Sequence, residues 1–119
     1  MVLEKGEKVH VMTRRLMEST PRAHVVGVVQ EAADGLARIE CWAYIWDRAG
    51  RRFVRKPHKR VRIVSLVSAD NIVTVMPPTA RLEDVEYRLE GRALTVTDGK
   101  GWSLDASEFA SFEDLLGAD

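Results

Sequence analysis

The sequence predicts a mainly β domain with a small β-meander and a short helix towards its C-terminal end. Three observations predict this fold class. β-branched and aromatic residues fall in short runs, turn residues separate these runs, and a double proline at 77–78 divides a longer first part from a shorter second part. The chain has 119 residues, of which 45% are hydrophobic and 30% are charged, which is the composition of one globular domain.

Five strands are expected before the double proline. The first run ends at Pro21, which has no backbone N–H to donate. The second and third runs are joined by a turn at residues 33–35, because Asp-Gly is a strong hairpin signal. The third run is long enough to bend, and Phe53 and Val54 can extend a strand within the loop that follows it. The expected strands cover residues 8–17, 23–31, 36–47, 61–68 and 71–76.

The composition changes after the double proline. Residues 81–84 are expected to form a helical turn, and Gly91 and Gly99 mark turns between short strands. Asp105 is placed to cap a helix, with Glu108 three positions later and apolar residues following at helical spacing. The expected strands cover residues 87–90, 93–97 and 101–104, and the expected helix covers residues 105–116.

Two segments carry motif-like patterns. Residues 61–77 form an apolar strand that meets Ala-Asp-Asn-Ile-Val and ends in Ile-x-Thr-Val-x-Pro. Residues 24–29 carry a glycine in the second expected strand, and Asp34 and Leu36 follow at the turn. These segments resemble the second and first motifs of the Sm-like family, which includes the LSm proteins and the bacterial RNA chaperone Hfq. The resemblance covers about residues 8–77.

The resemblance implies a five-stranded Sm-like or SH3-like barrel in residues 1–77, with residues 78–119 as a C-terminal appendage packed on it. It also implies a homo-oligomeric ring in which the fourth strand of one subunit pairs with the fifth strand of the next. Physical reasoning agrees, because an open barrel leaves strand edges unpaired and ring closure removes them. We expect about five to seven subunits.

The residues through which Sm-like proteins usually bind RNA are largely missing. Ala37 lies near the position of the family's asparagine, and Ser68 and Ala69 replace the Arg-Gly of the second motif. The Lys-His pair of Hfq has no counterpart either. Asn71 and Ile72 are kept. The resemblance therefore supports the barrel more strongly than the family's uridine pocket.

A zero net charge conceals two oppositely charged halves. Residues 1–62 contain 14 Lys and Arg but 7 Asp and Glu, whereas residues 63–119 contain 4 and 11. The stretch 48–62 is rich in Arg and Lys, ends at Arg62 and contains no acid. Because these side chains neutralise phosphates and Arg also stacks on bases, the stretch predicts a nucleic-acid-binding loop. The candidate nucleic-acid-binding residues, with Asn71 added from the motif, are Arg48, Arg51, Arg52, Arg55, Lys56, Lys59, Arg60 and Asn71. The alternatives are a solvated loop, or a loop that pairs with the acidic C-terminal region of the same or a neighbouring chain.

Residues 36–47 predict a core face and an aromatic face, because side chains alternate along a strand. The aromatic face carries Trp42, Tyr44 and Trp46, and rings at this period can stack on bases. A large exposed apolar patch is unusual, so we expect the C-terminal helix, the meander or another subunit to cover these rings. The expected core face carries Ala37, Ile39, Cys41, Ala43 and Ile45.

No catalytic, metal or cofactor site is expected. His10, His24 and His58 lie without the spacing of metal ligands, and the single cysteine, Cys41, falls on the expected core face, where a thiol is usually inert. The sequence contains no run of about 20 apolar residues, which a membrane-spanning helix needs, and no apolar N-terminal segment of a signal peptide. We therefore expect a cytoplasmic protein that is not an enzyme and has no membrane partner.

The sequence as a whole predicts a non-catalytic, Sm-like homo-oligomeric ring protein that binds RNA through its basic loop. The alternative is a structural or protein-interaction module whose basic and acidic halves serve self-assembly. A third hypothesis is a small-molecule binder that uses the aromatic face.

Overall fold

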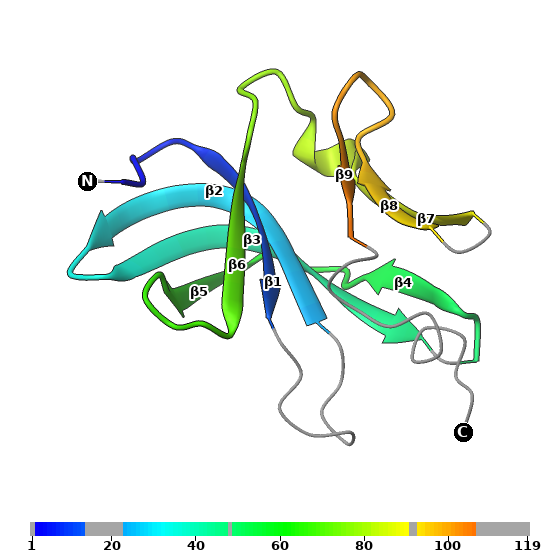
Figure 1. The fold of residues 1–119 in the computed structure, drawn as a ribbon, viewed down its shortest axis with the longest axis horizontal. Coiled ribbons are helices and arrows are strands. Elements are labelled where there is room, and N and C mark those ends of the chain that lie inside the picture. Colours follow the sequence, from blue (N-terminus) through cyan, green and yellow to red (C-terminus); the bar gives the residue numbers. More distant parts are fainter. Residues whose placement is uncertain (1, 14–22, 48, 91–92, 107–119) are drawn as a thin grey trace.

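The computed structural model describes residues 2–13, 23–47, 49–90 and 93–106 (Figure 1). These residues are mainly β-strand and form two antiparallel sheets, which confirms the predicted fold class at this level. The first sheet contains β1 (Lys8–Thr13), β2 (Ala23–Ala33), β3 (Leu36–Asp47), β4 (Arg52–Arg55), β5 (Arg60–Ser65) and β6 (Asn71–Met76). The second sheet contains β7 (Glu86–Glu90), β8 (Ala93–Thr97) and β9 (Ser103–Asp105), and a 3-10 turn, η1 (Leu82–Asp84), precedes it.

The first sheet has the strand order β4-β3-β2-β1-β6, and β5 also pairs with β3. β3 spans 12 residues, so it has room for two partners: residues 36–41 pair with β5, and residues 44–47 pair with β4. β5 and β6 follow each other in sequence, but no ladder joins them in the described part of the chain. The sheet is therefore open, with β5 and β6 as unpaired edges (Figure 1).

The hairpin of β2 and β3 turns at Asp34 and Gly35. Both residues have positive φ, 54° and 76°, as a type I′ turn requires, so the predicted Asp-Gly turn is confirmed. The β2–β3 ladder shifts its register between Val29 and Glu31. Such a bulge bends a strand and increases its twist, which is how a long hairpin curves around a core.

The first sheet packs a hydrophobic core on each of its faces. One core contains Val9 and Val11 of β1, and the other contains Met12 of β1 together with Leu94 of the second sheet. His10 is also fully buried on this second face. Alternation along β1 does not reveal that the second sheet covers this other face.

The predicted core face of β3 is confirmed. Four of its five side chains are buried and the last is half-buried: Ala37, Ile39, Cys41, Ala43 and Ile45. The four buried residues belong to the core that contains Val9. The aromatic residues of β3 consequently face the second sheet.

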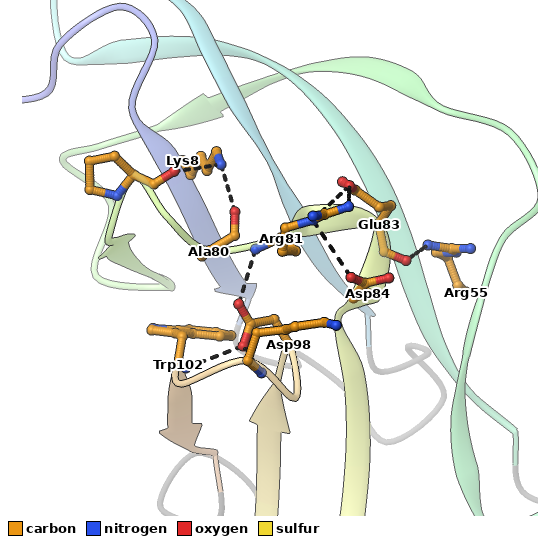
Figure 2. Close-up of polar contacts among 10 residues, drawn as sticks. Lys8, Arg55, Ala80, Arg81, Glu83, Asp84, Asp98 and Trp102 are labelled. Atoms are coloured by element: carbon orange, nitrogen blue, oxygen red, sulfur yellow. Dashed lines mark hydrogen bonds and ion pairs between the residues drawn. The ribbon is translucent and has the colours of Figure 1, made fainter.

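Residues 77–85, which connect the two sheets, are held by a side chain from the start of the chain. The ammonium group of Lys8 donates hydrogen bonds to the carbonyl oxygens of Pro78 and Ala80, at 2.7 and 2.6 Å (Figure 2). The two prolines have no backbone N–H, so this linker cannot pair as a regular strand. Its carbonyl oxygens at Pro78 and Ala80 are bound by the side chain of Lys8 instead. The entry to the second sheet is thereby fixed against β1.

The carboxylate of Asp98 fixes the other end of the linker. One oxygen accepts hydrogen bonds from the N–H groups of Lys100 and Trp102, at 2.8 and 3.2 Å, within the turn between β8 and β9. The other oxygen accepts the N–H of Arg81, at 3.0 Å (Figure 2). These three donors hold the pKa of Asp98 below its usual value.

The structure bears on three further local expectations. Asp105 ends strand β9, where it pairs with Thr95. The remainder of the expected helix, 107–116, lies outside the described residues, as does 14–17 of the first expected strand. The strand that Phe53 and Val54 were expected to extend within the basic loop is present as β4, and it pairs with residues 44–47 of β3.

Candidate nucleic-acid interface

The basic residues between positions 51 and 62 lie on β4, on the loop that follows and on β5; this stretch is called the basic segment below. Arg48, the first candidate, lies outside the described residues. Arg51 has a positive φ of 51° in the turn that precedes β4. Arg60 is half-buried, and the remaining basic side chains are exposed: Arg51, Arg52, Arg55, Lys56, Lys59 and Arg62.

Strand alternation divides the basic segment between two faces of the sheet. Arg60 and Arg62 lie opposite Cys41 and Ile39, so they extend from the core face of β3. Their positive charges partly oppose the burial that raises the pKa of the Cys41 thiol. Arg55 lies on the aromatic face. The sequence treated these residues as one continuous loop, whereas the structure presents two groups of positive charge.

Trp42 is the centre of the group on the aromatic face. The guanidinium carbon of Arg55 lies 4.5 Å from the centroid of its ring, and the ammonium nitrogen of Lys59 lies 5.5 Å from it, which are cation–π distances. Arg55 also donates a hydrogen bond to the carbonyl oxygen of Glu83, at 2.8 Å (Figure 2). Lys59 lies 3.8 Å from a carboxylate oxygen of Glu40. These contacts position two cations beside an aromatic ring.

Most charges of the basic segment are not neutralised by the part of the chain that the structure describes. The Lys59 ion pair is about half exposed, and such a pair contributes about 0–1 kcal/mol. The acidic residues Glu83 and Glu86 pair instead with Arg81 and Arg88 of their own half. The basic residues without an ion pair among the described residues are Arg51, Arg52, Lys56, Arg60 and Arg62. Their summed field attracts anions.

Asn71 is not brought together with the basic segment. Its amide nitrogen donates to the carbonyl oxygen of Ser65, and its amide oxygen accepts from the hydroxyl of Thr13, both at 3.0 Å. These bonds place it at the far end of β5, about 16 Å of strand away from Arg60. Its side chain stabilises the turn between β5 and β6 and the start of the β1–β6 ladder.

The second sheet covers most of the aromatic face of β3, as the sequence predicted for the meander. Tyr44 is buried, which raises its pKa, and donates its hydroxyl to the carbonyl oxygen of Val85 at 2.9 Å. Tyr87 of β7 stacks on Phe53 of β4, with centroids 4.4 Å apart, and Trp46 meets the edge of Phe53 at 5.2 Å. These rings contact one another, so they do not form an open platform for bases in this arrangement.

A groove of about 430 Å³ lies between β4 and β7, and the sequence analysis missed it. Its two walls come from parts of the chain about 30 residues apart, so no local pattern reveals it. One wall carries Arg52 and Arg55, and the facing wall carries Glu83, Asp84 and Glu86. A phosphate chain that approached β4 through this groove would be repelled by the carboxylates. The loop 56–59, away from the second sheet, is therefore the more favourable approach.

The described residues offer no candidate metal centre, since no three histidine, cysteine or acidic side chains in them are grouped to hold an ion. Cys41 is buried and its raised pKa keeps the thiol protonated at neutral pH, so it is a poor nucleophile. Over the same residues, no helix has the length and apolar character needed to cross a lipid bilayer.

Comparisons of the chain with family models, with curated proteins and with solved structures give no match. What the chain does is therefore argued from its fold, its strand edges and its basic segment.

Proposed function

We propose that this chain is a non-catalytic, Sm-like RNA-binding protein that assembles into a closed ring of its own copies. The observation that carries the proposal is the pair of unpaired, apolar edge strands. Four side chains on these edges are 42–61% exposed, two on β5 and two on β6: Val61, Ile63, Ile72 and Val75. Edge strands of this composition favour pairing with another strand, and natural monomers usually protect them.

The position of the two edges supports a ring rather than a simple dimer. β5 and β6 lie at opposite ends of one strand series, β5-β3-β2-β1-β6. Pairing of β5 in one copy with β6 in the next uses two different surfaces, so the contact repeats until the ring closes. The same strand series and the motif-like segments 24–29 and 61–77 support an Sm-like barrel, to which the neighbouring subunit contributes the closing ladder.

The basic segment supports RNA as the ligand of the ring. Its unpaired charges are repeated in every subunit, so many weak phosphate contacts act together. Asn71, the remaining family-like base-reading residue, holds the turn between β5 and β6 through Ser65. Binding is therefore expected to depend on phosphate neutralisation and to discriminate weakly between sequences.

Light scattering coupled to size exclusion tests the ring. The expected mass is about 67–94 kDa, five to seven times the 13.4 kDa chain. A monomer of 13.4 kDa at micromolar concentration would contradict the ring. Fluorescence anisotropy with a labelled single-stranded oligonucleotide, at about 50 mM salt, tests the RNA ligand, and absence of binding there would contradict it.

A further inference from the structure

A tyrosine hydroxyl of the second sheet lies between two histidines of the first. The hydroxyl oxygen of Tyr87 on β7 is 2.7 Å from Nε2 of His10 on β1 and 2.6 Å from Nδ1 of His24 on β2. The histidine rings meet at 81° with centroids 5.5 Å apart. His10 is fully buried and His24 is nearly so. One buried hydroxyl thus connects the two sheets.

The three side chains of this junction can share their protons in only a few hydrogen-bonding patterns. Tyr87 has one proton to donate, so one histidine must accept it while the other donates its own N–H to the same oxygen. Nδ1 of His10 is buried and has no hydrogen-bond partner. An unpartnered lone pair costs less than an unpartnered N–H, so His10 donates from Nε2 and Tyr87 donates to Nδ1 of His24.

Both histidines are neutral in this arrangement, and an added proton disrupts it. A proton on Nδ1 of His10 has no acceptor there. A proton on Nδ1 of His24 would direct a second N–H at the oxygen of Tyr87, whose own hydrogen would then lose its acceptor. Two charged rings 5.5 Å apart would also repel each other.

Among the residues that the structure describes, none supplies a charge that offsets a proton on His10. Phe53 of β4 stacks on His24, and Thr74 of β6 lies opposite His10 in the β1–β6 ladder. Tyr44 of β3, on which the positive charge of Arg55 acts, contacts the ring of Tyr87. Burial lowers the pKa of His10 to about 4 from its ordinary 6.5.

We propose that the His10–Tyr87–His24 junction is a pH-sensitive latch, which holds the second sheet on the first at neutral pH and releases it in mild acid. Other described contacts of the second sheet and its linker with the first sheet are hydrogen bonds from Lys8 and Arg55 to backbone carbonyl oxygens. Release uncovers the buried aromatic face of β3 and β4. The latch operates on a single chain, whether or not the chain forms a ring or binds RNA.

Hydrogen exchange followed by mass spectrometry, between pH 7.5 and 4.5, tests the latch on the full chain. After correction for the intrinsic exchange rate, the opening constant of β7 and β8 is expected to rise about tenfold per pH unit between 6.5 and about 4, as His10 takes up a proton. Peptides from β2 are expected to keep their protection. A pH-independent opening constant would overturn the proposal, as would simultaneous loss of protection in both sheets.

Two variants and one control locate the effect. His10→Gln places an amide N–H near the position of Nε2, and His24→Asn places an amide oxygen near Nδ1, and neither side chain takes up a proton. Each is expected to reduce the pH dependence of opening, whereas His58→Gln, on an exposed loop histidine, is expected to leave it unchanged. If His10→Gln fails to fold at pH 7.5, His24→Asn provides the same test. A wild-type slope in the folded variants would overturn the latch.

Discussion

Gly27 of β2 and Cys41 of β3 approach so closely across their ladder that a Cβ atom on Gly27 would lie 2.6 Å from the Cβ of Cys41. The same Cβ would also clash with the backbone carbonyl oxygen of Glu40. Cys41 is buried in the core and Glu40 O belongs to the strand itself, so neither can move aside freely. Only glycine, which has no Cβ, therefore allows the two strands to approach this closely at position 27.

Gly27→Ala is expected to destabilise the fold by about 2 kcal/mol or more, because overpacking against a backbone atom forces the strands apart. Urea denaturation at pH 7.5 measures it. Gly50→Ala is the control: there the nearest atom, 2.7 Å away, belongs to the flexible carboxylate of Asp47. Equal losses in the two variants would contradict the close-approach explanation.

Asp98→Asn is expected to lower the free energy of unfolding at neutral pH. It is also expected to remove the part of that free energy that the wild type loses in acid. Three N–H donors hold the pKa of Asp98 below 3.8, so its contribution is present above the unfolded value and is lost as the pH falls below it. In the variant, a side-chain NH2 group replaces the carboxylate oxygen that accepts the backbone N–H of Arg81. Two donors would then face each other, and the N–H of Arg81 would lose its acceptor. Urea midpoints between pH 5 and 2.5 should therefore fall less steeply in this variant than in Asp70→Asn, and parallel curves would contradict the assignment.

If the proposed ring forms, Ile63→Lys is expected to convert it into a species of about 13.4 kDa without unfolding the chain. The side chain of Ile63 is 61% exposed on the β5 edge, so a charge there costs the isolated subunit little and opposes pairing with β6. Light scattering gives the mass and circular dichroism the fold. Val2→Lys, at a fully exposed apolar residue away from both edges, should keep the wild-type mass.

Lys56→Gln combined with Lys59→Gln, both on the exposed loop 56–59, is expected to flatten the salt dependence of the proposed RNA binding. Contact with about four to six phosphates gives a log–log slope of about −3 to −4 on single strands, and two fewer contacts reduce its magnitude by about 1.4. Anisotropy titrations at several salt concentrations measure the slope. Arg88→Gln, whose cation pairs with Glu86 on the second sheet, is the control.

The same double variant separates RNA binding from charge-driven self-assembly. If the basic segment pairs with the acidic half of a neighbouring subunit, the double variant lowers the mass of the assembly. The salt dependence of RNA binding then no longer reports phosphate contacts of an intact ring. If the segment binds RNA, the ring mass stays unchanged while affinity for all sequences falls alike.

Local signals predicted the parts of the fold that depend on few residues. The turn at Asp34 and Gly35 follows from two backbone conformations, and the core face of β3 follows from alternation. The Tyr87 junction could not be predicted, because Tyr87 and His10 are 77 positions apart and no spacing rule joins them. The candidate residues of the basic segment were recognised by charge, but their division between two faces depends on the register of β5 against β3.

Lys8 and Pro78 are 70 residues apart along the chain, and this separation bears on how the protein folds. The ammonium group of Lys8 stays hydrated until β1 lies between β2 and β6, since its carbonyl acceptors come after β6 in sequence. Closing so long a loop costs chain entropy that a local hairpin does not pay. We therefore expect folding to nucleate at the β2–β3 hairpin and to finish when the carbonyl oxygens of the linker bind the ammonium group of Lys8.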